Sequence, residues 1–85
     1  MNIENIKDTL KKAYEFHKSN KREEAEKIYR QILEIDPNNF GSNYLLGSLF
    51  AQTKNLQEAK KLLQKALQID PNYADAYYNL GNVLI

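Results

Sequence analysis

The sequence predicts an all-α fold, a right-handed α-solenoid of two helix-turn-helix repeats followed by one trailing helix. The first observation is a repeated segment, because the residues Ile-Asp-Pro-Asn at 35–38 recur at 69–72, an offset of 34 residues. The second is that apolar residues recur at helical spacing, and no stretch alternates polar and apolar residues as a strand would. A fixed period of this length indicates a repeat architecture, in which stacked units present a surface.

Five helices are expected, at residues 3–18, 22–35, 40–52, 56–69 and 74–84. Pro37 and Pro71 cannot extend a helix and restrict the residue before them, so the upstream helices end near residues 35 and 69. The breaks between paired helices are short enough for tight antiparallel turns. Asn55 and Glu58 have the spacing of a capping box, and the segment 20–23 offers a similar helix start.

Small residues recur where two helices of a pair would cross. Ala13 and Gly47 occupy the first helix of each pair, and Ala25 and Ala59 occupy the second. Helix axes approach to ~8–10 Å when the side chains at the contact are small. Gly47 costs roughly 1 kcal/mol of helix propensity relative to alanine. We therefore interpret it as a crossing point, not as a flexible hinge.

The composition argues against several classes of function. The 85 residues include 12 lysines and arginines against 11 aspartates and glutamates, so there is no basic excess for nucleic-acid binding. The absence of cysteine excludes disulfides and thiolate metal sites. No apolar run is long enough for a membrane span, and the start lacks the layout of a signal peptide. We expect a cytoplasmic protein with no cofactor, no metal, no nucleic-acid partner and no membrane.

The repeated packing residues resemble those of the tetratricopeptide repeat, a family whose 34-residue unit is a helix pair. The second unit carries the matching residues Leu46, Gly47, Phe50, Ala59, Leu63, Ala66 and Pro71. The first unit carries Ala13, Phe16, Ala25, Tyr29, Ile32 and Pro37, and a partial third carries Tyr77, Leu80, Gly81 and Leu84. Because these are packing residues, the resemblance is specific for fold and says little about function.

The resemblance divides residues 1–85, taken as one domain, into repeat one at about 6–39, repeat two at about 40–73 and a partial repeat at 74–85. Thr9 and Lys12 stand where the family usually has a large aromatic and a leucine that touch a preceding unit. We therefore expect Met1 to open the array. Tyr77 and Leu80 keep the pattern of an internal first helix, which predicts the opening fragment of a longer array with an apolar end prone to pair with another copy.

The resemblance also implies that the first helices line a concave groove, where the family binds extended peptides or helices of a partner. The candidate partner-binding residues are Leu10, Tyr14, His17, Tyr44, Ser48, Gln52, Tyr78 and Asn82. Tyrosines offer large contact area with few torsions to freeze. An alternative is that Tyr44 and Tyr78 only cover the seam between repeats. Tyr29 and Tyr77 match packing positions and are expected in the core.

Two specialised functions within the family find little support in these residues. One subset binds C-terminal carboxylates with a clamp of lysine, asparagine and arginine, but Asp75 places a negative charge where a cation is needed. Another subset, in a glycosyltransferase, lines its groove with an asparagine ladder. Asn79 matches that place, whereas Leu45 and Lys11 occupy it in the earlier units.

No arrangement of residues in the sequence predicts catalysis. His17 is the sole histidine and has no carboxylate at helical spacing, so we expect it at the surface or in the groove. Adjacent Glu23 and Glu24 point ~100° apart on a helix and cannot flank one substrate atom. We therefore predict a protein-protein interaction module that is not an enzyme. The alternatives are a fragment that forms homodimers through its uncovered C-terminal helix, and the non-catalytic arm of a larger enzyme.

Overall fold

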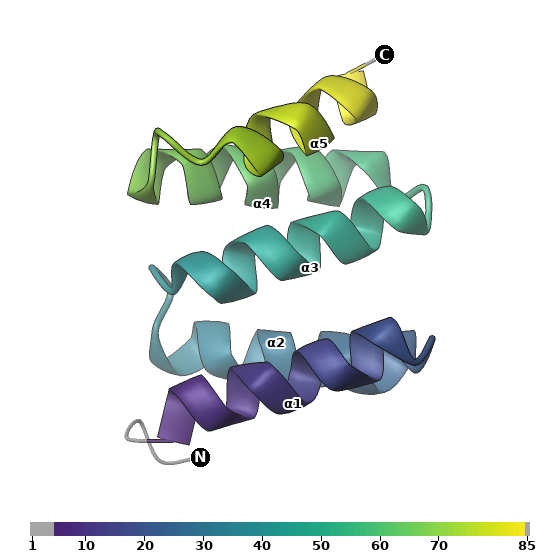
Figure 1. Cartoon of the computed structure of the whole chain (residues 1–85), viewed down its shortest axis with the longest axis vertical. Coiled ribbons are helices and arrows are strands. Elements are labelled where there is room, and N and C mark those ends of the chain that lie inside the picture. The colour runs from purple at the N-terminus through teal and green to yellow at the C-terminus, as the bar shows by residue number, and fades with distance from the viewer. Residues whose placement is uncertain (1–4, 85) are drawn as a thin grey trace.

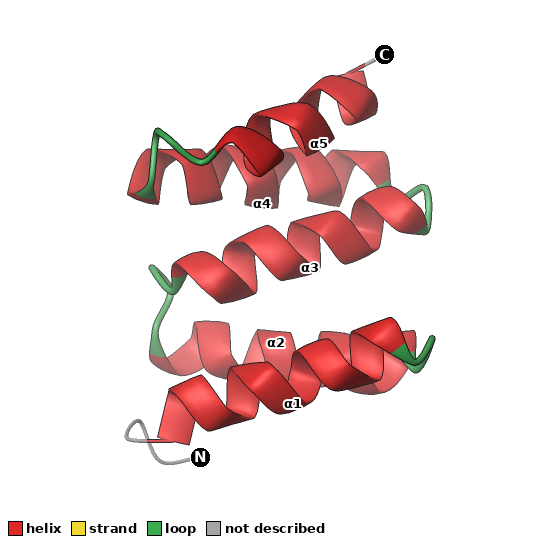
Figure 2. Ribbon diagram, in the orientation of Figure 1, coloured by secondary structure: helices red, strands yellow, loops and turns green. Residues whose placement is uncertain are grey.

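The computed structural model of the protein describes residues 5–84, without the side chain of Leu84. This part of the chain contains five helices and no strand (Figure 2). They are α1 (Ile6–Lys18), α2 (Arg22–Ile35), α3 (Phe40–Gln52), α4 (Leu56–Ile69) and α5 (Ala74–Leu84). The all-α prediction is confirmed, and four predicted ranges agree with these bounds. The expected helix start at residue 3 and the last residue of the third unit lie outside the described residues.

The helices stack crosswise to the long axis of the molecule in two layers (Figure 1). One layer holds α1, α3 and α5, and the other holds α2 and α4. Each helix packs against the one before it, and α3 also contacts both α1 and α5. The molecule measures 37 × 26 × 18 Å. None of the described helices is long and apolar enough to cross a membrane.

The 34-residue period is visible in the backbone as well as in the sequence. Asn20 and Lys54 stand at equivalent turn positions and have left-handed φ angles of 63° and 66°. Asp36 and Asp70 end α2 and α4 with φ of −133° and −132° and ψ of 82° and 91°. Because Asp36 and Asp70 share these angles, the two proline corners begin in equivalent conformations. Asn20 and Lys54 differ chemically, so we attribute their shared conformation to the packing of the flanking helices.

The small residues at the predicted crossings are buried between paired helices. Ala13, Ala25 and Ala59 have no exposed surface. A methyl group added to Gly47 would lie 2.9 Å from Cγ of Leu63, closer than two carbon atoms normally approach. The interpretation of Gly47 as a crossing point is confirmed, because α3 and α4 pack so closely there that a side chain would force them apart.

The predicted capping box is wrong. Asn55 precedes α4 with φ of −87° and ψ of 70°, and its side chain makes no cap hydrogen bond. Lys21 precedes α2 and makes none either. A side-chain cap requires extended backbone at the capping residue. That conformation occurs at Asn39, with φ of −67° and ψ of 111°, and its Oδ1 accepts a hydrogen bond from the Ser42 amide at 2.8 Å.

Of the two tyrosines expected in the core, Tyr29 is completely buried and Tyr77 is not. Tyr77 is 54% exposed, and its hydroxyl donates a hydrogen bond to the Pro71 carbonyl at 2.9 Å. Its counterpart 34 residues earlier, Asn43, is only 3% exposed. The difference arises because α4 packs over that face of α3, whereas no described helix covers the same face of α5.

Candidate functional site

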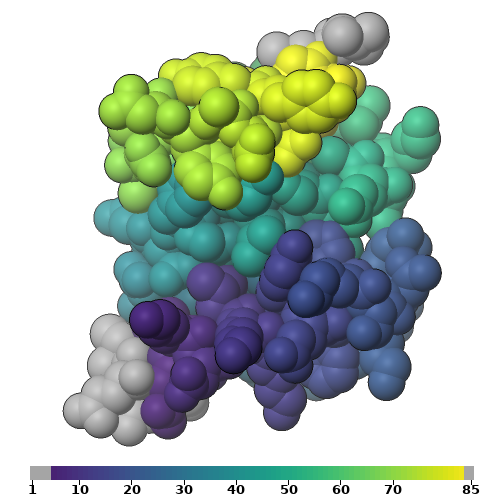
Figure 3. All heavy atoms as spheres, in the orientation of Figure 1, coloured from purple at the N-terminus to yellow at the C-terminus, as the bar shows by residue number. Residues whose placement is uncertain are grey.

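A groove of about 910 Å³ runs across the layer formed by α1, α3 and α5. Figure 3 shows this face of the molecule, where teal side chains of α3 lie between the purple and blue ones of α1 and the yellow-green ones of α5. Six of the eight predicted partner-binding residues line the groove. They are Tyr14, His17, Tyr44, Ser48, Gln52 and Asn82.

The remaining two predicted residues, Leu10 and Tyr78, do not line the groove. Leu10 packs against the backbone of α3 so closely that a methyl group on Gly41 would overlap its side chain. Tyr78 is 71% exposed. Tyr78 stands 34 residues after Tyr44. The Tyr44 side chain is held in place by Tyr73, in the loop before α5, and by Asn79 on α5. No described residue does the same for Tyr78.

His17 lies in the wall of the groove but is buried, only 8% exposed, where the sequence predicted a surface or groove-lining position. Its Nε2 lies 2.9 Å from Oε1 of Gln52, and its Nδ1 lies 3.2 Å from the Tyr29 hydroxyl. Because the amide oxygen only accepts, Nε2 donates to Gln52, and Nδ1 shares a hydrogen bond with the Tyr29 hydroxyl. This chain of bonds joins α2, α1 and α3.

The hydroxyl of Tyr29 forms the end of this chain of hydrogen bonds that lies in the core. Burial raises the pKa of the Tyr29 phenol well above its usual value, and the nearby Tyr14 raises it further. Tyr29 is completely buried, and its ring stands edge-on to His17 with centroids 6.2 Å apart. Sequence reasoning placed Tyr29 in the core but did not connect it to His17, because a helical pattern does not show which neighbours a hydroxyl meets.

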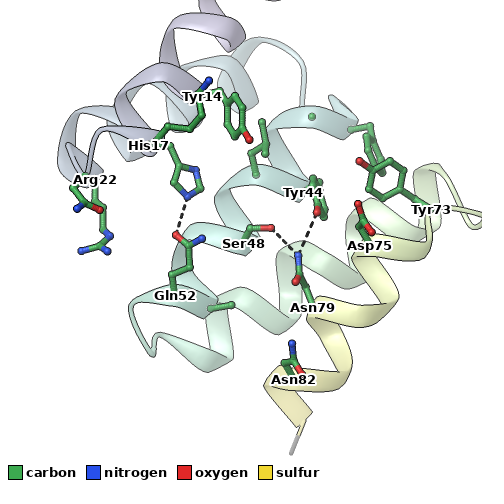
Figure 4. Close-up of a pocket in the computed structure, with 16 residues that line it drawn as sticks. Tyr14, His17, Arg22, Tyr44, Ser48, Gln52, Tyr73, Asp75, Asn79 and Asn82 are labelled. Carbon is green, nitrogen blue, oxygen red and sulfur yellow. Dashed lines mark hydrogen bonds between the residues drawn. The ribbon is translucent and has the colours of Figure 1, made fainter.

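Asn79 on α5 forms the second hydrogen-bonded link in the groove (Figure 4). Its Nδ2 donates to the Tyr44 hydroxyl at 3.3 Å and to Ser48 Oγ at 3.1 Å. The sequence singled out Asn79 only as one rung of an asparagine ladder. It could not show that the side-chain amide nitrogen is used within the chain to hold α5 against α3.

Three aromatic rings gather at the end of the groove where α3 begins. Phe40 and Tyr44 are stacked, with centroids 5.9 Å apart and planes within 6°. Tyr73 stands edge-on to both, at 4.9 Å from each. Burial raises the pKa of the Tyr44 phenol, and the nearby Tyr73 and Asp75 also raise it. Phe40 and Tyr44 stand four residues apart on α3, but Tyr73 lies in the loop before α5, where periodicity gives no signal.

The charged residues of the groove stand at its two ends. Lys18 and Arg22 flank the turn between α1 and α2, and Asp75 lies in the first turn of α5. The Lys18 ammonium sits over the ring of Tyr14, 4.9 Å from its centroid. Within residues 5–84 the one ion pair joins Arg30 to Glu26 on α2, outside the groove. The three groove charges therefore have no partner of opposite sign among the described residues.

The groove offers hydrogen-bonding and aromatic contacts. No group of three or more histidine, cysteine, aspartate or glutamate residues that could hold a metal ion occurs in the described part of the chain. Both ring nitrogens of the single histidine, His17, form hydrogen bonds, one with Gln52 and one with Tyr29. The His17 side chain therefore connects helices as part of the structure.

The fold and the groove define a helical-repeat protein of the type that presents a concave surface. The sequence matches the family described as "Tetratricopeptide repeat" over residues 16–65 and the one described as "TPR repeat" over residues 47–85. The chain belongs to the tetratricopeptide-repeat family. Repeats of this family are generally protein-interaction modules and typically non-catalytic.

A solved structure places this fold within a larger protein. A mutant of the O-GlcNAc transferase of Thermobaculum terrenum is similar over 93% of this chain, with 38% sequence identity and a TM-score of 0.89. The matched part is 15% of that transferase chain. None of the curated proteins compared with the chain is significantly similar to it.

Proposed function

We propose that the chain binds a peptide or helix of a partner protein in the groove between α1, α3 and α5. One observation carries the proposal: polar and aromatic side chains from all three helices line one continuous groove of about 910 Å³. We further propose that residues 6–39, 40–73 and 74–85 act as successive repeat units, each supplying its first helix to this surface. The chain itself performs no chemistry in this proposal.

Two hydrogen-bonded links support a pre-organised binding surface. Gln52 is held to His17 at one end, and Asn79 is held to Tyr44 and Ser48 at the other. Side chains fixed before binding lose little freedom when a partner arrives, which favours affinity. The groove positions of these side chains therefore suit recognition by shape and by hydrogen bonds.

Tyr44 is the residue on which we expect affinity to depend most. It is half-buried, stacks on Phe40 and points its hydroxyl at Asn79, so its ring presents a fixed face to the groove. Tyrosines that anchor an interface commonly contribute more than 1 kcal/mol to binding. Tyr78 provides a matched control, because it is an exposed tyrosine on α5 that does not line the groove.

The test uses peptides selected on the purified protein from a random displayed library. Fluorescence anisotropy then gives their affinity for the wild type, Tyr44→Ser, Asn82→Ala and Tyr78→Ser, and circular dichroism shows that each variant is folded. We expect Tyr44→Ser to weaken binding about fivefold or more. Asn82→Ala should weaken it less, and Tyr78→Ser should leave it unchanged. Equal losses for Tyr44→Ser and Tyr78→Ser would overturn the groove assignment.

A second candidate function is the non-catalytic arm of a larger enzyme. The similarity at 38% identity to 15% of an O-GlcNAc transferase chain favours it. In that case the groove would hold a protein substrate for a catalytic domain elsewhere in the same polypeptide. The full open reading frame decides this candidate, because the arm requires a transferase domain encoded in it.

Pairing of two copies through α5 is the remaining candidate, and the exposure of its tyrosines favours it. Tyr77 is 54% and Tyr78 is 71% exposed on this helix. Sedimentation at several protein concentrations tests it, because a dimer of this kind gains mass as concentration rises. A mass of one chain at every concentration would overturn it, and Tyr78→Ser should shift any dimer toward the monomer.

A further inference from the structure

The charges that line the groove are sorted by sign along its length. Lys18 and Arg22 stand at the turn that joins α1 to α2, and Asp75 stands at the start of α5. Figure 4 shows Arg22 and Asp75 at opposite sides of the pocket. Among the described residues no other lysine, arginine, aspartate or glutamate lines the groove. One end is therefore cationic, the other is anionic, and the floor between them is uncharged.

These charges are available to a ligand. All three residues are exposed, and none forms an ion pair with a described residue. The Lys18 ammonium lies over the ring of Tyr14, which also lines the groove. At the opposite end, Asp75 lies close enough to Tyr44 to raise the pKa of that phenol. The anionic end therefore coincides with the aromatic cluster of Phe40, Tyr44 and Tyr73.

We propose that the groove takes an extended segment of a partner protein with acidic side chains beside Lys18 and Arg22 and a basic side chain beside Asp75. This proposal rests on the proposed binding function and adds the chemistry and direction of the ligand. An acidic side chain meets two cations at one end. A lysine or arginine at the other end meets a carboxylate and aromatic faces, which together favour a cation.

The distance between the two charged ends sets the spacing of the opposite charges in the ligand. Lys18 ends α1 and Asp75 lies at the start of α5, which runs in the same direction, so the charges are separated both across the helices and along them. Two steps between helices of ~10 Å each, combined with ~17 Å along the helices, give ~26 Å. An extended chain covers this distance with about eight residues, at ~3.3 Å each. A helix of eight residues would rise only ~12 Å, so a segment of this length reaches both ends only when it is extended.

The charges of Lys18 and Asp75 can also be explained by helix stability, and the test must distinguish that role from ligand binding. Lys18 lies in the last turn of α1 and Asp75 in the first turn of α5, where each sign is favourable to the helix dipole. A dipole role affects folding stability but has no influence on which peptide binds. Asp8, in the first turn of α1, and Lys12 are exposed and lie outside the groove, so they provide matched control positions.

The experiment uses two synthetic peptides of equal length with capped ends. The bipolar peptide carries two glutamates, five serine and alanine residues, and a terminal lysine. The neutral peptide replaces the charged residues by glutamine. Titration of isotopically labelled protein, followed by amide chemical shifts, gives an affinity and a location for each. We expect the bipolar peptide to bind about fivefold more tightly, from contacts worth roughly two- to fivefold each at exposed sites.

Charge variants then assign the preference to named residues. Asp75→Asn should weaken the bipolar peptide roughly two- to fivefold and leave the neutral peptide unchanged. Asp8→Asn and Lys12→Gln should change neither. Raising the salt from about 0.01 M to about 1 M shortens the Debye length from about 30 Å to about 3 Å and should remove the preference.

A nitroxide label on the glutamate end of the bipolar peptide tests the direction. We expect it to broaden the amide signals near Lys18 and Arg22 and to spare those near Asp75. In the triple variant Lys18→Glu, Arg22→Glu, Asp75→Lys the broadening should move to the α5 end. Broadening at the α5 end of the wild type, or equal broadening at both ends, would overturn the proposal.

The outcomes separate this proposal from the binding function beneath it. Equal affinity for the two peptides, with shifts in the groove, overturns the charge order and leaves the binding function intact. Shifts outside the groove for both peptides, or no shifts with either, overturn both. A preference for the bipolar peptide that Asp75→Asn does not reduce overturns the assignment of its basic end.

Discussion

The two proline corners of the chain, residues 36–43 and 70–77, begin with nearly the same backbone angles at Asp36 and Asp70 but are stabilised by different side chains. At the first corner the Asn43 amide donates to the Pro37 carbonyl at 3.1 Å and to the Asn39 carbonyl at 2.9 Å. At the second, the Tyr77 hydroxyl donates to the Pro71 carbonyl at 2.9 Å. The corner is thus fixed by its proline and by helix packing. Asn43 and Tyr77, which stand 34 residues apart, each donate to the carbonyl of the proline in their own corner, Asn43 from a buried position and Tyr77 from an exposed one.

A parallel contrast separates the two glycines of the repeat. Gly47 faces Leu63 of α4, and an added methyl group would lie 2.9 Å from that side chain. Gly81 is its counterpart on α5, and nothing lies within 4 Å of a methyl group there. Close packing therefore requires glycine at position 47, whereas no described neighbour requires it at position 81.

The largest effect is expected from one substitution made at both glycines. Gly47→Ala should destabilise the protein by up to about 2 kcal/mol, because overpacking typically costs ~1–3 kcal/mol and helix propensity returns ~1 kcal/mol. Gly81→Ala should stabilise it by up to about 1 kcal/mol. Urea denaturation measures both. Changes of equal sign and size would contradict the difference in packing.

A smaller difference between the two units is expected at the proline corners. Asn43→Ala should destabilise by about 1–2 kcal/mol, since it removes two part-buried hydrogen bonds and opens a space beneath α4. Tyr77→Phe keeps the ring, and water can reach the freed Pro71 carbonyl, so it should cost no more than about 0.5 kcal/mol. Thermal unfolding of the two variants provides the measurement. A larger loss in Tyr77→Phe would show that exposure does not decide the cost.

The hydrogen-bonded pair His17 and Tyr29 of the first unit is replaced in the second unit by Ala51 and Leu63, which do not titrate. Because burial raises the pKa of Tyr29, the unfolded chain loses that proton at a lower pH than the folded protein. Stability from this residue is fully present below about pH 10, the unfolded value, and declines as pH rises, by about 1.4 kcal/mol per pH unit. Tyr29→Phe should flatten this decline in urea titrations at pH 9–11. An unchanged slope would remove Tyr29 as the cause.

The smallest effect is expected at the helix turns. Lys54 adopts a left-handed conformation that asparagine, its counterpart at position 20, tolerates more readily. Lys54→Asn should therefore stabilise by about 0.5 kcal/mol, and Asn20→Lys should destabilise by a similar amount. Denaturation midpoints measure the two changes. Opposite signs from these would show that side-chain contacts, not backbone conformation, dominate the turns.

The sequence predicted the helices well because their ends and crossings depend on residues that repeat. Prolines stop α2 and α4, and Ala13, Gly47 and Ala59 mark contacts that need small side chains. The capping prediction failed because spacing alone does not set the backbone angles of Asn55. Tyr77 was misplaced because its burial depends on a covering helix, which the pattern within α5 does not reveal.

The groove was predicted less completely than the fold. The offset of 34 residues located Tyr44 and Ser48 on one surface, since equivalent positions of stacked helices share a face. It did not reveal that Asn79 would bridge them, or that Tyr73 would join the aromatic cluster from a turn. Contacts between units depend on side-chain identities that differ from one repeat to the next, so they could not be inferred from periodicity.

The most direct test of the groove is a map of amide chemical shifts on adding a library-selected peptide to the labelled protein. If partner segments bind between α1, α3 and α5, the largest shifts should fall at Tyr44, Ser48 and Asn79. Residues Lys61 and Lys65 on α4 should remain unchanged. The largest shifts on α4, or on the outer face of α5 around Tyr77, would contradict the account.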